Sequence, residues 1–428
     1  MTGKLTLAVL AWMGIFAIAT PAAAQEPSTE LLARAEQVIA LVQGRANPAE
    51  MFTPEFLAQV PQTQVRAVTG QLVAQYGAAR RVAGIEPQSA TAATVHYDFE
   101  RAIVHMQIDI QPQAPHHIAG LLVTGADMSG DSFTAVLAEL RALPGQTSVA
   151  IARLGDGAPE LIASIEPDRP LAIGSAFKLF ILAELSRQIV AGQRHWNDVV
   201  VLDRRSIPSG LLQSWPSGSP LTVHTLAALM ISQSDNTASD VLLHLAGREN
   251  VERMMTTIGV QAAGRNRPIL STLELSAIKT ASDAAVAAWR TADEAGRRRL
   301  LGSDYASADA TRIDLARFTG APLHIDSVEW FASAADLVRT MDWLRRNGDE
   351  TARAILAINP GLGSPLTGSL DYVGYKGGSE PGVLNLTWLV RNRAGTWHVV
   401  TGSWNNPAAP VQEAQLIGLL SRAIQLVR

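Results

Sequence analysis

The sequence contains no cysteine. Disulfide bonds, thiol nucleophiles and cysteine-ligated metal sites are therefore excluded. Lysine is almost as scarce, because only Lys4, Lys178, Lys279 and Lys376 occur among the 35 basic residues. Arginine keeps its proton in proteins, whereas a buried lysine can release it. Two of the three lysines that follow the predicted signal peptide, Lys178 and Lys376, fall in the motifs described below.

The chain also lacks an excess of positive charge and, after its first residues, any long apolar run. A formal net charge of -4 with no basic block argues against a nucleic-acid partner. Residues 1–25 combine a short basic start, an apolar stretch and Ala22-Ala23-Ala24. This pattern predicts a cleaved signal peptide over 1–24, with a retained membrane anchor as the alternative. We expect a periplasmic or secreted protein with no membrane contact after cleavage.

What is present divides into two units, the first of them small. Its patterns predict helices at about 29–42, 50–59 and 62–76, and then strands over 93–99, 102–110 and 117–125. Helices followed by consecutive antiparallel strands make an α+β domain, assigned to residues 25–126. The polar, glycine-containing segment from about 124 to 132 reads as a linker.

The second unit, residues 127–428, is predicted to be α+β as well. It opens with a helix and a β-hairpin over 147–167, continues with helices to about 358, and closes with a hairpin over 382–404 and an amphipathic helix over 411–427. Strands at both ends with helices between them predict one antiparallel sheet built from both termini of the unit.

A first motif lies in the run AIGSAFKLF, where Ser175 and Lys178 are three residues apart. On a helix this spacing makes neighbours of the two side chains. The apolar surroundings predict burial, which lowers the pKa of a lysine toward that of a general base, and the helix N-terminus favours a serine alkoxide. The pattern is that of an activated serine nucleophile. Alone, however, Ser-x-x-Lys is mostly a chance match.

A second motif, Ser234-Asp235-Asn236, interrupts two apolar helical runs. Serine, aspartate and asparagine favour caps and turns, so a plain helix–helix junction is one interpretation. In the other, Ser234 relays a proton and the Asn236 amide holds a substrate carbonyl. The motif alone favours the junction.

A third motif, Lys376-Gly377-Gly378 followed by Ser379, precedes a predicted strand. Paired glycines let a backbone lie close to a ligand. A strand-end turn with an exposed lysine is the alternative.

In this order the three motifs resemble Ser-x-x-Lys, Ser-Asp-Asn and Lys-Thr-Gly of class A β-lactamases and penicillin-binding proteins. The resemblance covers about residues 130–428 and implies the serine β-lactamase fold, an antiparallel sheet against a helical subdomain. It implies that Ser175 is acylated with Lys178 as base, and that Ser234 and Lys376 carry a proton to the leaving nitrogen. The N–H groups of Ser175 and Ser379 would form the oxyanion hole, and no cofactor or metal is required.

Two departures from this family pattern concern binding and turnover. Gly377 lacks the hydroxyl that normally helps to hold a substrate carboxylate, and Ser379 is a candidate to replace it. Deacylation in class A enzymes uses a Glu-x-x-x-Asn loop that is not found here. Glu274 is the acid in the corresponding stretch, but Ser271-x-x-Glu274 also reads as a helix capping box, which we favour. Slow turnover is the expected consequence.

Around MFTPEFLAQVP and LVAQYG, the first unit resembles the small domain of the accessory β-lactamase-fold protein of clavulanic-acid gene clusters. That domain is similar to cone-shaped, steroid-isomerase-like α+β folds. No isomerase chemistry is carried over, since an exposed strand face explains the polar residues of the strands. Those residues are His96, Asp98, His105 and Asp109.

Other polar and aromatic residues have weaker patterns. Four further histidines are candidate metal ligands by residue type, but their spacing in the sequence is not that of a metal site. They are His116, His117, His195 and His224. Trp215 and Pro216 either wall a pocket or anchor a surface loop.

The sequence leaves three functions open. The first is a serine hydrolase acting on the amide of β-lactams, and the second is an esterase or a D-Ala-D-Ala peptidase. The third is a module that only binds or senses a ligand. Two lysines in one buried site argue against the third.

Overall fold

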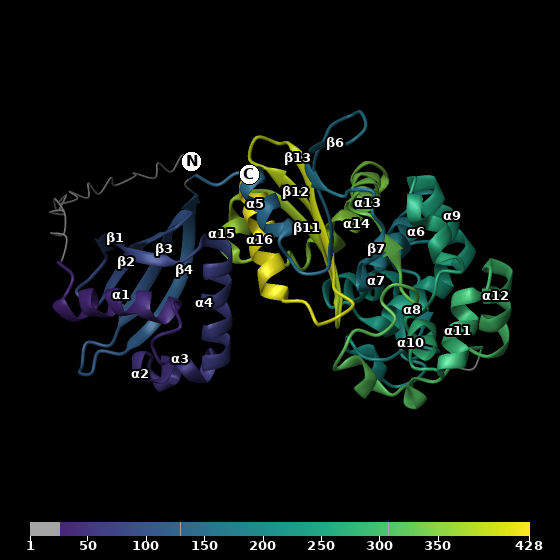
Figure 1. Ribbon diagram of the computed structural model, residues 1–428, viewed down its shortest axis with the longest axis horizontal. Helices are drawn as coiled ribbons and strands as arrows, with labels where there is room; N and C mark the ends of the chain where they lie inside the picture. The colour runs from purple at the N-terminus through teal and green to yellow at the C-terminus, as the bar shows by residue number, and fades with distance from the viewer. Residues whose placement is uncertain (1–25, 129, 307) are drawn as a thin grey trace, which may run out of the picture.

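The computed structural model describes residues 26–128, 130–306 and 308–428 (Figure 1). The predicted signal peptide lies outside these residues. Two units stand side by side, with the N-terminal unit at the left of the view and the helices α6 to α12 at the far right (Figure 1). No helix in the described ranges is both long and apolar enough to span a membrane.

The N-terminal unit is a four-stranded antiparallel sheet with helices against it, in strand order β1-β2-β3-β4. The helices predicted over 29–42 and 62–76 are confirmed, but a single helix over 50–59 is wrong. Thr53 caps a new helix there, with Pro54 at its first position. The elements are α1 (Thr29–Val42), α2 (Pro48–Met51), α3 (Pro54–Gln59), α4 (Gln62–Tyr76), β1 (Ala79–Pro87), β2 (Ala92–Phe99), β3 (Ala102–Ile110) and β4 (Ile118–Met128).

The sheet of this unit has a buried face and an open face. Tyr97 is buried under α1, where its hydroxyl donates to the carbonyl of Ala35 at 3.0 Å. His96 and His105 lie on the open face, contact each other through Nδ1, and pair through Nε2 with Glu86 and Asp127. The similarity to a cone-shaped domain stays a prediction.

Strand β4 continues to Met128, so the predicted linker is strand over its first five residues. The second unit then begins with α5 (Phe133–Arg141), as predicted. Its five-stranded antiparallel sheet has the order β11-β12-β13-β5-β6, which confirms a sheet built from both ends of the unit. The strands are β5 (Gln146–Leu154), β6 (Glu160–Ile165), β11 (Leu370–Glu380), β12 (Val383–Asn392) and β13 (Trp397–Asn405).

This sheet lies between two layers of helices, each with its own apolar core. On one face α13 packs against β5 and β13, and the other helices of the layer gather beyond it. On the other face lie α5, α15 (Ser364–Gly368) and α16 (Glu413–Gln425). The first layer comprises α6 (Lys178–Val190), α7 (Val223–Ser232), α8 (Asn236–Ala246), α9 (Arg248–Ile258), α10 (Thr272–Lys279), α11 (Asp283–Thr291), α12 (Glu294–Ser303), α13 (Ala334–Asn347) and α14 (Glu350–Ala357).

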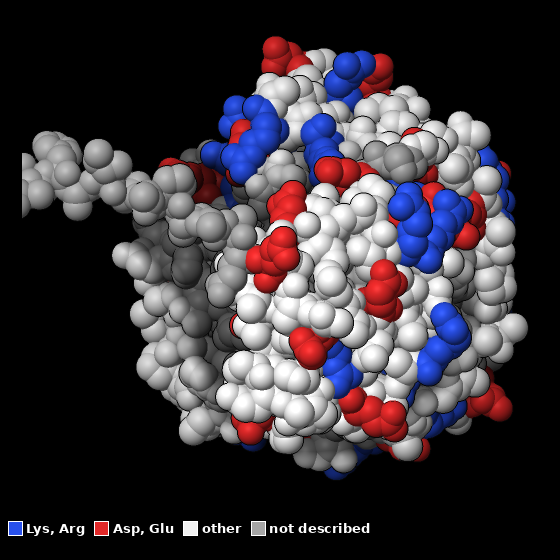
Figure 2. All heavy atoms as spheres, turned by 90° about the vertical axis from the view of Figure 1, so that its left-hand side faces the viewer, with Lys and Arg blue, Asp and Glu red and all other residues white. Residues whose placement is uncertain are grey.

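The two units meet where α4 runs beside α16 (Figure 1). Gln425 of α16 donates to the hydroxyl of Tyr76 at 3.0 Å. The fully buried Arg422 bonds to Asp131 at 2.7 Å and to Glu139 at 2.8 Å, so the last helix is tied to the segment that joins the units. Viewed from the N-terminal side, acidic and basic side chains are interspersed over the surface (Figure 2).

Candidate active site

A cavity of about 550 Å³ opens where the edge strand β11 meets the helical layer. Much of its lining comes from the turn before α6, the turn before α8, the start of α10 and the end of β11, which are distant from one another in sequence. All three sequence motifs therefore contribute to one cavity. The motif residues that line it are Ser175, Ser234, Asn236, Lys376, Gly377, Gly378 and Ser379.

Ser175 sits on a single 3₁₀ turn, η1 (Gly174–Phe177), that leads directly into α6. The turn is held by Phe177, whose ring stacks on Trp330 with centroids 3.8 Å apart. Trp330 also lines the cavity. Since Ser175 Oγ has no hydrogen-bond partner among the described residues, its hydroxyl is available to a ligand in the cavity.

Lys178 is fully buried, and its amine is surrounded by oxygen atoms of the second motif. Nζ lies within hydrogen-bond distance of three oxygen atoms, the Ser234 carbonyl at 2.6 Å, Ser234 Oγ at 3.0 Å and Asn236 Oδ1 at 2.8 Å. The helix spacing predicts a direct contact with Ser175, and no such hydrogen bond is formed in the described structure. The 3₁₀ turn and the three competing acceptors account for the difference. Burial and the nearby charge of Lys376 lower the pKa of Lys178 well below its usual value.

Ser234 links the two buried lysines. Lys376 Nζ donates to Ser234 Oγ at 3.0 Å, the same distance as that from Lys178. Burial lowers the pKa of Lys376 to about 7. Ser234 itself has a φ of 56°, in the left-handed region that costs a non-glycine residue energy. Such strain is concentrated at functional sites, and here it turns the Ser234 side chain and carbonyl toward the lysines.

The structure confirms the helix junction at the second motif, and the catalytic interpretation stays a prediction. Asp235 caps α8 by accepting from the N–H of Ala238 at 2.8 Å, so the motif is a helix junction. At the same junction Asn236 accepts from Lys178 through Oδ1, which leaves its Nδ2 donors unpaired among the described residues. Because Asn236 also lines the cavity, these donors can hold a substrate carbonyl.

The third motif lies inside strand β11, not in a strand-end turn. A Cβ at Gly378 would lie 2.2 Å from the Ile173 carbonyl oxygen and 2.4 Å from the Ser175 nitrogen. Glycine is therefore the residue that lets the edge strand touch η1. A Cβ on Gly174 would in turn lie 3.2 Å from the Ser379 nitrogen. The backbone nitrogens of Ser175 and Ser379 thus lie at the same strand–turn contact, and their role as an oxyanion hole stays a prediction.

The model of the beta-lactamase enzyme family matches residues 131–347. The chain belongs to the beta-lactamase enzyme family. Its second unit accordingly has the α+β fold of the serine β-lactamases and penicillin-binding proteins. No curated protein matches the chain.

Solved structures similar to this β-lactamase-family chain include a β-lactamase from Sphaerobacter thermophilus, at 22% identity over 68% of this chain and 94% of that one, with a TM-score of 0.45. A mutant of PBP-A in an acyl-enzyme complex with penicillin G has 15% identity over 69% and 95%, with a TM-score of 0.48. A β-lactamase from Chitinophaga pinensis has 16% identity over 69% and 97%, with a TM-score of 0.47.

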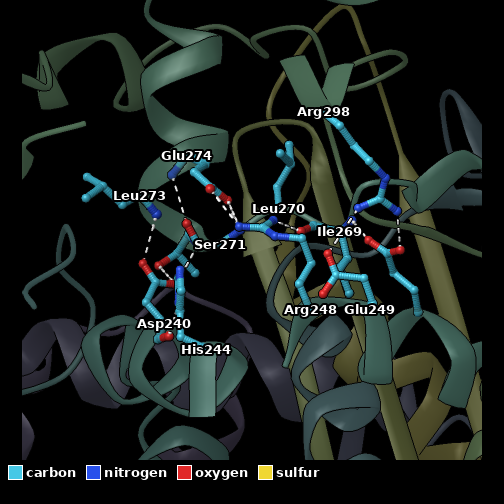
Figure 3. Close-up of polar contacts among 12 residues, drawn as sticks. Asp240, His244, Arg248, Glu249, Ile269, Leu270, Ser271, Leu273, Glu274 and Arg298 are labelled. Atoms are coloured by element: carbon cyan, nitrogen blue, oxygen red, sulfur yellow. Dashed lines mark hydrogen bonds and ion pairs between the residues drawn. The ribbon is translucent and has the colours of Figure 1, made fainter. Parts of the chain in front are cut away.

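Glu274 is a structural residue of this β-lactamase-family chain, and the capping box is confirmed. Its carboxylate accepts from the Ser271 N–H at 2.8 Å and from Arg248 at 2.7 and 2.9 Å (Figure 3). Glu274 does not line the cavity formed by the described residues. The alternative role in deacylation is therefore not supported by its position.

Replacing Glu274 by glutamine is expected to lower the stability of the protein by about 1–2 kcal/mol, because a charge-assisted pair is lost. Deacylation of any acyl-enzyme should be unchanged. Thermal unfolding and the decay of the adduct mass measure the two effects. Glu160→Gln is the matched control, since its pair with Arg153 is exposed and worth little. Slower adduct decay in Glu274→Gln would contradict the assignment.

Hydroxyl groups, not carboxylates, occupy the part of the cavity wall that α10 forms. Thr272 and Ser276 line it there. Behind them the buried Asp240 accepts from the Thr272 N–H and Oγ, both at 2.7 Å. Burial raises the pKa of Asp240. Asp240 is thus engaged in holding the start of α10.

The carboxylates that do line the cavity, Glu380 and Glu413, lie elsewhere. Glu380 shares the buried Lys279 with Glu329. Sequence reasoning missed this cluster, because its members lie about 50 residues apart in no common motif. Trp330 was missed as well.

Trp215 and Pro216 do not line the cavity; Trp215 is exposed in a loop whose backbone carbonyl accepts from Arg205 at 2.8 Å. The surface-loop interpretation of the sequence is the correct one. No cluster of three or more histidine or acidic side chains suited to a metal occurs in the described ranges.

Proposed function

We propose that this protein is an exported serine hydrolase that forms an acyl-enzyme on Ser175 and opens the amide of β-lactams. One observation carries the proposal: Ser234 Oγ lies 3.0 Å from the amines of both Lys178 and Lys376, in the cavity that Ser175 lines. Two buried amines with lowered pKa values are costly to a fold. Two buried amines with lowered pKa values are expected in a site that transfers protons, whereas simple ligand binding does not require them.

The proposed reaction uses each motif residue at a stated atom. Neutral Lys178 takes the proton of Ser175 Oγ, which attacks the lactam carbonyl carbon. The carbonyl oxygen gains negative charge and is held by the N–H groups of Ser175 and Ser379. As the C–N bond breaks, Ser234 Oγ gives its proton to the leaving nitrogen and receives one from the Lys376 ammonium. Asn236 Nδ2 orients the substrate.

Deacylation is proposed to be slow. The wall where α10 begins offers the hydroxyls of Thr272 and Ser276, and the acid in this stretch, Glu274, is bound to Arg248. A water molecule that approaches the acyl group from the α10 side therefore lacks an adjacent carboxylate as base. The acyl-enzyme should outlast that of an enzyme with such a base.

Intact-protein mass spectrometry tests the proposal. The mature chain and Ser175→Ala are mixed with a penicillin and a cephalosporin and sampled over time. A mass gain that requires Ser175 supports acylation, and its decay measures turnover. A permanent adduct would favour a binding or sensing role. If neither drug forms an adduct or is consumed, the β-lactam assignment is wrong, and esters and D-Ala-D-Ala peptides are the next substrates.

The acylation rate is expected to fall as the pH rises through about 7, the value to which burial lowers the pKa of Lys376. Below this pH the amine carries the proton that the leaving nitrogen needs, and above it the proton is lost. Lys178 must be neutral, and its lowered pKa keeps it so. Lys376→Arg keeps its proton, so the fall should disappear in this variant. A fall that persists in Lys376→Arg would assign it to another group.

Export is proposed on the signal-peptide pattern of residues 1–24. N-terminal sequencing of the protein from a bacterial periplasm should begin at Gln25. A first residue of Met1 in a membrane fraction would instead indicate a retained anchor.

A further inference from the structure

The side chain of Tyr375 fills the space that a side chain at residue 377 would need. Alternate residues of a strand point to the same face, so these two positions are neighbours on β11. A Cβ at Gly377 would lie 2.2 Å from Tyr375 Oη and 2.9 Å from its Cζ. The phenol oxygen therefore stands close to where a threonine or serine at 377 would carry its hydroxyl.

The ring of Tyr375 is held on two sides. It stacks on Trp388 of β12, with centroids 5.0 Å apart and planes 29° apart. A Cβ at Gly361 would lie 2.6 Å from its ring carbons, so the backbone of that loop also rests against the ring. Burial raises the pKa of Tyr375, so the phenol keeps its proton at neutral pH. A fixed, protonated hydroxyl is a well-placed hydrogen-bond donor.

This hydroxyl has no partner among the described residues, although Tyr375 lines the cavity beside Lys376 and Ser379. Tyr372, three residues earlier on the same strand, differs because its hydroxyl donates to the Arg353 carbonyl at 2.7 Å. Phenol hydroxyls commonly form hydrogen bonds at binding surfaces. The hydroxyl of Tyr375 is therefore available to a ligand in the cavity.

The charges around the cavity indicate whether charge attraction or hydrogen bonding positions an acidic group of the substrate. Among the described lining residues Lys376 supplies positive charge, and no arginine lines the cavity. Glu380 is bound by Lys279, and Glu413 adds negative charge near Tyr375. An acidic substrate group thus receives little charge attraction here. Its position depends on directed hydrogen bonds.

We propose that Tyr375 Oη donates a hydrogen bond to the acid group that a β-lactam carries beside its scissile amide. Tyr375, and not Ser379, then replaces the hydroxyl that the third motif lacks at Gly377. This inference rests on the proposed function and names the residue that selects acidic substrates within it. Tyr375 orients the substrate and takes no part in proton transfer.

The test is the acylation of Ser175 by benzylpenicillin and by its uncharged methyl ester, followed by mass over a range of concentrations. Tyr375→Phe keeps the ring and its packing on Trp388. With benzylpenicillin it is expected to raise the half-saturating concentration about 10-fold or more, leaving the maximal rate nearly unchanged. With the ester the increase should be smaller, since a hydrogen bond to a neutral acceptor is weaker.

Two control variants make the result specific. Tyr372→Phe removes a phenol oxygen that lies outside the cavity and should acylate like the parent. Ser379→Ala tests the alternative donor and should change the half-saturating concentration by less than Tyr375→Phe does. Equal increases for acid and ester in Tyr375→Phe would indicate a lost packing role and overturn the inference. So would a larger increase in Ser379→Ala.

Failure of this inference is distinct from failure of the proposed function. If the parent is acylated at Ser175 but Tyr375→Phe is acylated with the same concentration dependence, the inference is wrong and the hydrolase assignment stands. If the parent gains no Ser175-dependent mass with either compound, the assignment itself fails, and the role of Tyr375 fails with it.

Discussion

Lys178→Met is expected to lower the rate of Ser175 acylation by about 10²–10⁴, the usual contribution of a positioned general base. Methionine has a similar volume but no amine, so the Ser234 carbonyl and Asn236 Oδ1 lose a donor while the buried space stays filled. The oxyanion site and Ser175 stay in place. Rapid mixing with a penicillin, followed by mass spectrometry at early times, measures the change.

The matched comparison is Lys178→Arg, which places at this position a permanently charged group that cannot release its proton. If Lys178 is the base, both variants lose acylation to a similar degree. If its charge merely attracts the substrate, Lys178→Arg should retain much of the rate. Acylation at the parent rate in Lys178→Met would assign the base to another group, with Lys376 the next candidate through Ser234.

Gly378→Ala is expected to lower acylation by about 10²–10³, the effect of losing one oxyanion donor. The new Cβ would lie 2.2 to 2.7 Å from three backbone atoms of η1 and its capping residue Ile173, none of which can rotate away. The edge strand and the serine turn must separate, and their N–H groups then no longer converge on one oxygen. The affinity for substrate should change far less than the rate.

Gly368→Ala is the control, because a Cβ there meets nothing within 4 Å. It lies in α15, directly before β11, and should leave both acylation and thermal stability near those of the parent. Circular dichroism establishes that Gly378→Ala is folded. A folded Gly378→Ala protein that acylates normally would show that the contact between β11 and η1 does not shape the oxyanion site.

Elements with a strong period were predictable from the sequence. The hairpin of β12 and β13, the last helix α16 and the helices α1 and α4 lie where their patterns place them. Strand β1 gave little signal, because Arg80, Arg81 and Glu86 are exposed along it and mask its alternation. The prediction of one helix over 50–59 was wrong because Thr53 and Pro54 begin a new helix there.

The sequence predicted which residues belong to the candidate site better than it predicted the contacts between them. Three short motifs led to Ser175, Lys178, Ser234 and Lys376, since each motif is local in sequence. The lysine–serine contact expected from helix spacing was replaced by contacts to the second motif, 56 and 58 residues away. Tyr375 and Trp330 take their roles from neighbours such as Gly377 and Phe177, which only the folded chain brings together.

The order of strands in the larger sheet also bears on how the chain folds during synthesis. Strand β5 pairs with β13, and Ala150 of β5 lies opposite Thr401 of β13. The centre of the sheet can therefore form only after β13 has been synthesised. Pairings so distant in sequence are slow, and unpaired strand edges invite aggregation. The N-terminal unit, made first, can fold during this delay. Helix α16 follows β13 in sequence and packs on α4, so we expect attachment of the two units to come late in folding.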